Sequence, residues 1–479
     1  MRNIDIMDLS NFIIMRNELS LIVVVLLILI AEIFSSKKSH SLLLNLATAL
    51  FGLHTILGFL PAETGSLFGG MYQNTALIIL MKNVLNIGVL VVLMQVQGWL
   101  KKPENNNRSL EFYMLTFSTL LGMYYMISAG DFLMLYLGLE LATIPIATLV
   151  AYDVYKMKST EAGIKLILLA AVSSGVMLYG ISIIYGTTGS LYFSEVMGGL
   201  AMNPLQILAT VFFISGLAFK ISLAPFHLWT ADVYEGAPTN VAGYLSVVSK
   251  GASVFVLIAL LFTVFKDMVE AWKPLLAVMA VTTMVVGNLF AIRQQNLQRF
   301  LAFSSIAQAG FILLGMISGT PYGMATVIYF VLVYVFSNLA AFGVVSIVKN
   351  ATGKDRIDDY NGFYQTNPML SLVMLLALFS LAGIPPLAGF FGKFFLFAAV
   401  AEQGMYWLVL IAVINTIVSL YYYLLVVKAI FVVRSENPME LIKGDPLARL
   451  GLVITVLGIL AVGIYSPIFD WVQAVSFGI

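Results

Sequence analysis

The chain of 479 residues has no cysteine and only three histidines. Without cysteine it cannot form disulfides, hold an iron–sulfur cluster through thiolates or carry a thioether-linked haem. The histidines, His40, His54 and His227, are too few and too scattered along the sequence for a histidine-rich metal site. We therefore expect no cofactor on this chain, and any redox chemistry would belong to a partner protein.

Charge is also scarce, because charged residues make up 10% of the chain and hydrophobic residues 60%. Soluble globular proteins carry about 25% charged residues, so this composition excludes a water-soluble enzyme. The net charge of +1 gives no electrostatic reason to expect nucleic acid as a partner. The sequence therefore predicts a protein embedded in a lipid bilayer.

Long apolar runs follow one another along the whole sequence, and each is near the ~20 residues that cross a bilayer as a helix. We expect one all-helical membrane domain over residues 1–479. Its fourteen predicted spans are 19–34, 41–60, 74–97, 110–129, 132–152, 163–186, 204–228, 238–263, 274–291, 299–318, 322–346, 368–397, 406–432 and 449–468.

The lysines and arginines separate clearly between the two sides of the predicted membrane. Connections after odd-numbered spans hold fifteen of the 25 basic residues, whereas the tails and the remaining connections hold four. Because basic loops stay in the cytoplasm, both termini are expected on the non-cytoplasmic side of a bacterial inner membrane. The other basic residues fall inside the spans: Lys82, Lys165, Lys220, Lys250, Lys393 and Lys428.

Four charged residues lie deep within spans, namely Glu140, Lys220, Lys250 and Lys393. An ionised lysine at the bilayer centre costs about 2.5–3.5 kcal/mol, so such residues persist where they face water, pair or exchange protons. Glu140 is the clear acidic residue deep in a span. We interpret these four side chains as parts of a transport path.

The other lysines within spans allow more than one interpretation. Lys428 lies near a span end, where a long side chain can extend to the surface. Lys165 begins the sixth span, and extension to the surface or transport is equally consistent with its position. Lys82 lies nearer mid-span without a surrounding motif, so it has either a structural hydrogen-bonding role or a role in transport.

Two of the deep lysines lie beside residues that break helices. Lys220 comes five residues before Pro225, and Lys393 comes seven residues after Pro386. Proline removes a backbone donor, and the carbonyl groups it frees within a membrane need water or protein partners. The two breaks are five spans apart and have the opposite order of lysine and proline, which favours an inverted repeat.

At this point the sequence resembles a known family, the antiporter-like membrane subunits of respiratory complex I, over nearly its whole length. The resemblance rests on several motifs, which are Gly138 to Leu141 (GLEL), Lys220 to Trp229 (KISLAPFHLW), Asp232 to Pro238 (DVYEGAP), Leu301 to Ile306 (LAFSSI), Gly383 to Lys393 (GIPPLAGFFGK) and the run Tyr421 to Tyr423. Lys393 distinguishes the chain from subunit M, which has glutamate there, and the short C-terminal part distinguishes it from subunit L.

The resemblance implies fourteen helices with broken helices seven and twelve. It also implies inverted five-helix repeats at 110–263 and 274–432, preceded by helices in 1–109 and followed by one in 433–479. Protons would pass through Glu140, Lys220, Lys250 and Lys393, with Lys165 contributing, coupled to quinone reduction elsewhere. The chain would be a non-redox translocase subunit of NADH:quinone oxidoreductase, and its partners would be other membrane-arm subunits and subunits carrying FMN and iron–sulfur clusters.

One position departs from the family pattern, and three other functions stay open. Gln308 follows the Ser-Ser-Ile run where the family often has histidine, and since glutamine does not titrate, it would only order hydrogen bonds or water. The nearest alternative is a subunit of a multi-subunit Na⁺/H⁺ antiporter or of a membrane-bound hydrogenase. A stand-alone transporter of a small solute and a scaffold subunit without transport are the others.

Overall fold

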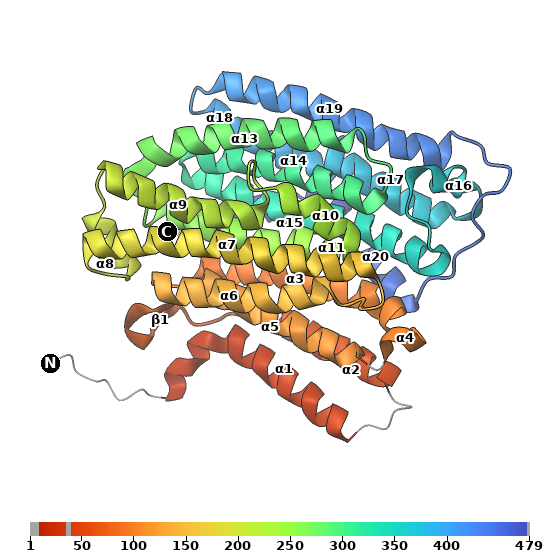
Figure 1. Ribbon diagram of the computed structural model, residues 1–479, viewed down its shortest axis with the longest axis horizontal. Helices are drawn as coiled ribbons and strands as arrows, with labels where there is room; N and C mark the ends of the chain where they lie inside the picture. Colours follow the sequence, from red (N-terminus) through yellow and green to blue (C-terminus); the bar gives the residue numbers. More distant parts are fainter. Residues whose placement is uncertain (1–8, 35–39, 107, 477–479) are drawn as a thin grey trace.

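The computed structural model describes residues 9–34, 40–106 and 108–476, and most of these residues are helical. The long helices lie side by side with their axes roughly parallel (Figure 1). Helix α1 (Arg16–Ile33) lies along one long edge of this view, α19 (Tyr406–Phe431) along the opposite edge, and α15 (Pro321–Thr352) between them. All-helical architecture agrees with the sequence prediction.

The N-terminal part packs two helices and a short hairpin against a long third helix. Its remaining elements are η1 (Leu9–Met15), α2 (His40–Gly58), β1 (Gly65–Leu67), η3 (Phe68–Gly70), β2 (Tyr72–Asn74), α3 (Ala76–Leu100) and α4 (Pro103–Asn106). The strands pair antiparallel, and an isolated bridge joins Tyr72 to Ala129 in the next part. We call the side with this hairpin the hairpin face and the side where α3 ends, at Lys101 and Lys102, the basic face.

Two further sets of helices follow the N-terminal part along the chain. The first set is α5 (Ser109–Ile127), α6 (Phe132–Val150), α7 (Met157–Thr188), α8 (Phe193–Gly199), α9 (Pro204–Ile221), α10 (Leu228–Gly236), α11 (Thr239–Tyr244), the π turn η4 (Leu245–Ser249) and α12 (Lys250–Phe262). The second is η5 (Lys266–Met268), α13 (Val269–Ala291), α14 (Leu297–Ser318), α15, η6 (Ile357–Tyr360), α16 (Phe363–Thr366), α17 (Pro368–Ala382), α18 (Ala388–Ala401) and α19. The chain continues with α20 (Pro446–Ile464) and α21 (Pro467–Ser476).

The two sets correspond in their long helices and in their breaks. Each contains a helix of 32 residues, α7 in the first and α15 in the second, and each of these ends at a glycine in the left-handed conformation. The next helix is interrupted in both sets, between α9 and α10 and between α17 and α18. The predicted breaks at helices seven and twelve are therefore confirmed.

Short polar side chains fix where several helices begin. The Asp131 carboxylate accepts the amide of Met134 at 2.8 Å and caps α6, and Asn203 caps α9 in the same way at the amide of Gln206. Thr320 caps α15 through the amide of Gly323. Such caps satisfy amide groups that the first turn of a helix leaves without partners.

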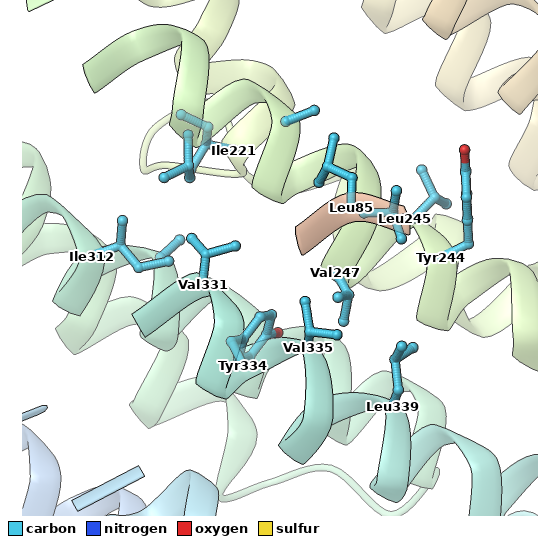
Figure 2. Packing of buried hydrophobic residues seen from close by; sticks show 14 of the residues in the cluster. Leu85, Ile221, Tyr244, Leu245, Val247, Ile312, Val331, Tyr334, Val335 and Leu339 are labelled. Carbon is cyan, nitrogen blue, oxygen red and sulfur yellow. The ribbon is translucent and has the colours of Figure 1, made fainter. Parts of the chain in front are cut away.

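The centre of the molecule is shielded from its surroundings. All of the most apolar stretch of α14 and of α15 is buried. Figure 2 shows how Val331, Val335 and Leu339 of α15 pack near Leu245 and Val247 of η4. Charged groups at this depth are therefore surrounded by protein and not by lipid.

Twelve helices among the described residues are long and apolar enough to cross a membrane. The predicted spans 110–129 and 368–397 are not among the twelve, and they correspond to α5 and to the broken pair α17 and α18. The count of fourteen stays a prediction. Two predicted limits differ from the helices: the first span began at residue 19 and omitted Glu18, which lies inside α1, and the seventh ended at Leu228, the first residue of α10.

Candidate functional site

Glu140 and Lys220 approach one another from α6 and α9 without forming an ion pair. The ammonium group of Lys220 donates to the hydroxyl group of Thr143, which lies one turn after Glu140 on α6. Atom Oε1 of Glu140 is buried and has no hydrogen-bond partner among the described residues. Both side chains are only partly buried. The structure therefore places the predicted pair in one region but in an open arrangement.

The break after Lys220 is closed by hydrogen bonds from side chains. Ser222 has a φ of 67°, which turns the chain out of α9. The indole group of Trp229 then donates to the carbonyl oxygen of Phe219 at 3.0 Å, and the amide of Ala224 donates to Thr283 at 2.9 Å. Thr283 thus pairs a backbone amide that the interrupted helix leaves free within the membrane, and Trp229 adds a second donor to the carbonyl oxygen that the amide of Ser222 also binds.

Replacing Trp229 with phenylalanine is expected to lower the free energy of unfolding by about 0.5–1.5 kcal/mol, because the carbonyl oxygen of Phe219 loses the indole donor and keeps only the amide of Ser222. The temperature of thermal aggregation in detergent would measure the effect. Trp407→Phe is the control, since that side chain is 52% exposed. Equal aggregation temperatures for the two variants would contradict the assigned role of the indole group.

Lys250 is the first residue of α12 and follows the π turn η4 directly. Lys250 is 2% exposed. Its ammonium group donates two hydrogen bonds to Ser305, to the hydroxyl oxygen at 3.0 Å and to the carbonyl oxygen at 3.1 Å. A π turn inserts an extra residue into a helix and is frequent at functional sites. Lys250 is therefore held against α14 by two hydrogen bonds at one residue.

Lys393 is held at the second break. It lies on α18 and is 3% exposed, and its ammonium group donates to the carbonyl oxygen of Ala382, the last residue of α17, at 3.1 Å. The chain leaves α17 at Gly383 with a φ of 89°. The ammonium group also lies 4.6 Å from the ring centroid of Phe311 on α14, a cation–π contact.

Polar side chains of α14 and α19 lie between Lys250 and Lys393. Ser304 of α14, the neighbour of Ser305, lies 2.5 Å from the hydroxyl group of Tyr423 on α19. Gln308, one turn further along α14, donates to that hydroxyl group at 3.3 Å and to the carbonyl oxygen of Leu381 at 3.0 Å. Leu381 precedes Ala382, which binds Lys393. We call this set, Ser304, Ser305, Gln308 and Tyr423, the α14 bridge.

The sequence did not assign the α14 bridge. Its members appeared there only as parts of motifs or, for Gln308, as a departure from one. The available signal was the spacing: Ser304, Ser305 and Gln308 are polar residues within about one turn of each other in the middle of α14, where their neighbours are mostly apolar and all are buried. Between Lys220 and Lys250, the described residues form no comparable chain of side-chain hydrogen bonds.

Lys165 lies apart from the other predicted site residues. Its ammonium group pairs with Glu161 at 2.7 Å and with Asp232 at 3.0 Å, and its side chain is 41% exposed. Arg299 joins the same cluster through Asp232 at 2.7 Å and Glu235 at 3.0 Å. The structure thus places Lys165 in an ion-pair network, separate from the buried lysines.

The remaining two lysines differ from each other. Lys428 is exposed near the end of α19, in agreement with a side chain that extends to the surface. Lys82 is fully buried and forms an ion pair with Glu18 of α1 at 2.6 Å. Glu18, in the first turn of α1, is thus a second buried acidic residue, which the sequence analysis did not single out.

Comparison with known proteins identifies the family to which the chain belongs. The family model described as NADH:quinone oxidoreductase/Mrp antiporter, TM, matches residues 129–419. A protein named NADH-quinone oxidoreductase subunit N from Phocaeicola vulgatus is 51% identical over 465 residues, which cover 97% of this chain and 98% of that protein. The chain belongs to the subunit N family of NADH-quinone oxidoreductases. This is the branch that Lys393 favours over subunit M.

Other relatives support the family assignment. A protein of the same name from Desulforamulus reducens is 43% identical, covering 95% of this chain and 96% of that protein. A chain of respiratory complex I from Thermus thermophilus is 31% identical, with a TM-score of 0.78 and coverage of 96% of this chain and 98% of that one. This chain is accordingly an antiporter-like, multi-pass membrane subunit of the kind found in the membrane arm of complex I.

The fold itself is shared more widely than the subunit N family. A chain of the Mrp complex from a Dietzia species is similar with a TM-score of 0.84 at 19% identity. It covers 96% of both chains, and the likeness at this identity shows the fold alone. Among the described residues, no group of three or more metal-ligating side chains is placed to hold a metal ion.

Proposed function

We propose that this chain carries protons across the membrane through Glu140, Lys220, Lys250 and Lys393. The observation that supports this most is the α14 bridge, whose hydroxyl and amide groups lie between the contact of Lys250 with Ser305 and the second break, where Lys393 is held. Hydroxyl groups both donate and accept hydrogen bonds, so they can pass a proton or order the water that does. Atom Oε1 of Gln308 is buried without a partner, which leaves an acceptor for such a water.

The pair of Glu140 and Lys220 is the proposed switch. In the structure Lys220 donates to Thr143, and a small movement along α6 would bring it to Glu140. At ~4 Å and an effective dielectric constant of ~20, the two charges attract one another by about 4 kcal/mol. Moving one charge across a potential of ~200 mV requires about 4.6 kcal/mol, so the attraction within the pair is of the same order as the work of pumping one proton.

The proposal includes the location and the repeats. The chain would lie in the bacterial inner membrane with both termini on the non-cytoplasmic side, which makes the basic face cytoplasmic. Its inverted repeats would span 110–263 and 274–432. The chain would hold no redox centre, and Lys165, in its ion-pair network, would contribute at the basic face and not within the buried path.

The identity of the partners can be tested directly. When the chain carries an affinity tag and is purified in mild detergent, we expect NADH-oxidising and iron–sulfur subunits to be purified with it. Purification together with Na⁺/H⁺ antiporter or hydrogenase subunits alone would contradict the assignment to complex I. Purification as a single chain that transports a small solute would favour the secondary-transporter alternative.

Removing the hydroxyl group of Tyr423 tests the α14 bridge. The Tyr423→Phe variant is expected to lower NADH-driven proton uptake by about tenfold, because general acid–base groups contribute factors of this order or more. Ser304 and Gln308 would both lose a partner, while the buried ring keeps its packing. Tyr421→Phe is the control, since the Tyr421 side chain is exposed. Unchanged uptake in assembled Tyr423→Phe complex would exclude the bridge from the path.

A further inference from the structure

A second cluster of ionisable groups lies in the hairpin-face half of the molecule, away from the proposed path. The ammonium group of Lys82 on α3 donates to Oε1 of Glu18 on α1 at 2.6 Å. The Tyr72 hydroxyl group donates to Oε2 of Glu18 at 2.9 Å and accepts from Lys82 at 3.1 Å. We call Glu18, Tyr72 and Lys82 the α1–α3 cluster.

A gain in folding stability does not explain why Glu18 and Lys82 are buried as an ion pair. The side chains of Lys82 and Glu18 are 0% and 1% exposed, so both charges have lost their water. Replacing a buried ion pair with apolar residues of similar size is often neutral or stabilising, because desolvation offsets the attraction between the charges. Ionisable residues within a membrane are more often functional than structural.

Two aromatic rings beside the cluster stabilise the positive charge of Lys82. Atom Nζ of Lys82 lies 5.2 Å from the ring centroid of Tyr72 and 5.5 Å from that of Tyr124 on α5. The negative faces of aromatic rings stabilise a nearby cation. If Glu18 became protonated, Lys82 would still have these two rings as partners.

A separate chain of hydrogen-bonded polar groups lies beside the cluster, at Tyr124. The Tyr124 hydroxyl group donates to Asn86 and lies 2.9 Å from Nε2 of His54. On the other side of the same imidazole, Nδ1 lies 2.9 Å from the hydroxyl group of Ser20 on α1. His54 therefore joins α1 to α5 through both of its nitrogen atoms, within reach of the rings that surround Lys82.

A cavity at the hairpin face lies beside the segments that carry the cluster. It has a volume of about 420 Å³, and we call it the vestibule. Met81 and Gln73, which line it, are the sequence neighbours of Lys82 and Tyr72. Ile127 and Ala129 line it as well, and the hydroxyl group of Ser128 between them is buried without a hydrogen-bond partner among the described residues.

We propose that the α1–α3 cluster is a second proton-carrying site of this chain, which exchanges protons with water in the vestibule. The ion pair of the structure corresponds to a carboxylate group on Glu18 and an ammonium group on Lys82. A hydronium ion would give a proton to Glu18 and leave as water, so that an O–H bond forms on the carboxyl group while Lys82 stays charged. Release to water reverses the step. This inference rests on the proposed function.

The double variant Glu18→Gln/Lys82→Met tests the site in the assembled complex. It removes both charges together, so no unpaired charge remains buried, as it would in Lys82→Met alone. We expect assembly, seen on native gels, and a loss of NADH-driven proton uptake by vesicles as complete as in Glu140→Gln. An assembled double variant that takes up protons like the parent would overturn the proposal.

If the double variant does not assemble, the parent complex and Glu18→Asp decide the question by infrared difference spectroscopy. Turnover should produce a carboxylic C=O band that shifts in Glu18→Asp. The absence of any band sensitive to this substitution would overturn the proposal. The proposed function fails on a different result, which is full proton uptake in Glu140→Gln, so the two failures can be told apart.

Discussion

The Glu140→Gln variant is expected to abolish proton pumping by vesicles that contain the assembled complex. Glutamine keeps the shape of the side chain but removes the charge, and with it the attraction of about 4 kcal/mol that would draw Lys220 from Thr143. Without this second position, Lys220 has one arrangement only and the switch cannot operate. NADH-driven acidification of the vesicle interior, followed with a pH-sensitive dye, is the measurement.

Two comparisons make the Glu140 result decisive. Glu402→Gln is the matched control, because Glu402 is exposed at the end of α18 and should tolerate the same change. Lys220→Ala should reproduce the loss seen in Glu140→Gln, since either residue is needed for the pair. Full pumping by either variant, with assembly intact, would show that the pair is not the switch.

The Lys393→Met variant is expected to have the second large effect, a fall of proton pumping to the background of uncoupled vesicles. Methionine fills a similar volume and needs no partner, so the carbonyl oxygen of Ala382 loses its donor while the apolar contact with Phe311 remains. The last charged group of the path is then missing. The assay is the same, with the amount of assembled complex determined on native gels.

Lys428→Met serves as the control for Lys393, because it makes the same substitution at an exposed lysine. It should pump like the parent. If Lys393→Met also pumped at the parent rate, protons would not pass the second break, and the α14 bridge would end without a function.

The sequence predicted the parts of the site that depend on local chemistry. Apolar length located the long helices, and the glycine and proline residues around positions 225 and 386 located the two breaks. The deep lysines were recognised because a charge inside an apolar run is costly. None of these steps requires knowledge of which helices touch.

What depends on the rotation and neighbours of a helix could not be predicted in this way. Thr143, and not Glu140, is the partner of Lys220, and one turn of α6 separates the two possibilities. The bond between Lys250 and Ser305 joins residues that are 55 positions apart. Glu18 was missed because the apolar window begins just after it, and only the structure shows that it is buried and paired with Lys82 of α3.

The burial of α14 and α15 makes the two ends of the path unequal. Lys250 and Lys393 lie against a helix that is wholly enclosed by this chain, whereas Glu140 and Lys220 are partly open to whatever adjoins α6 and α9. A change of charge outside the chain would thus be felt first at Glu140, and its influence would weaken with distance toward Lys393. In the proposed path, Glu140 is therefore the residue on which a charge outside the chain would act most strongly.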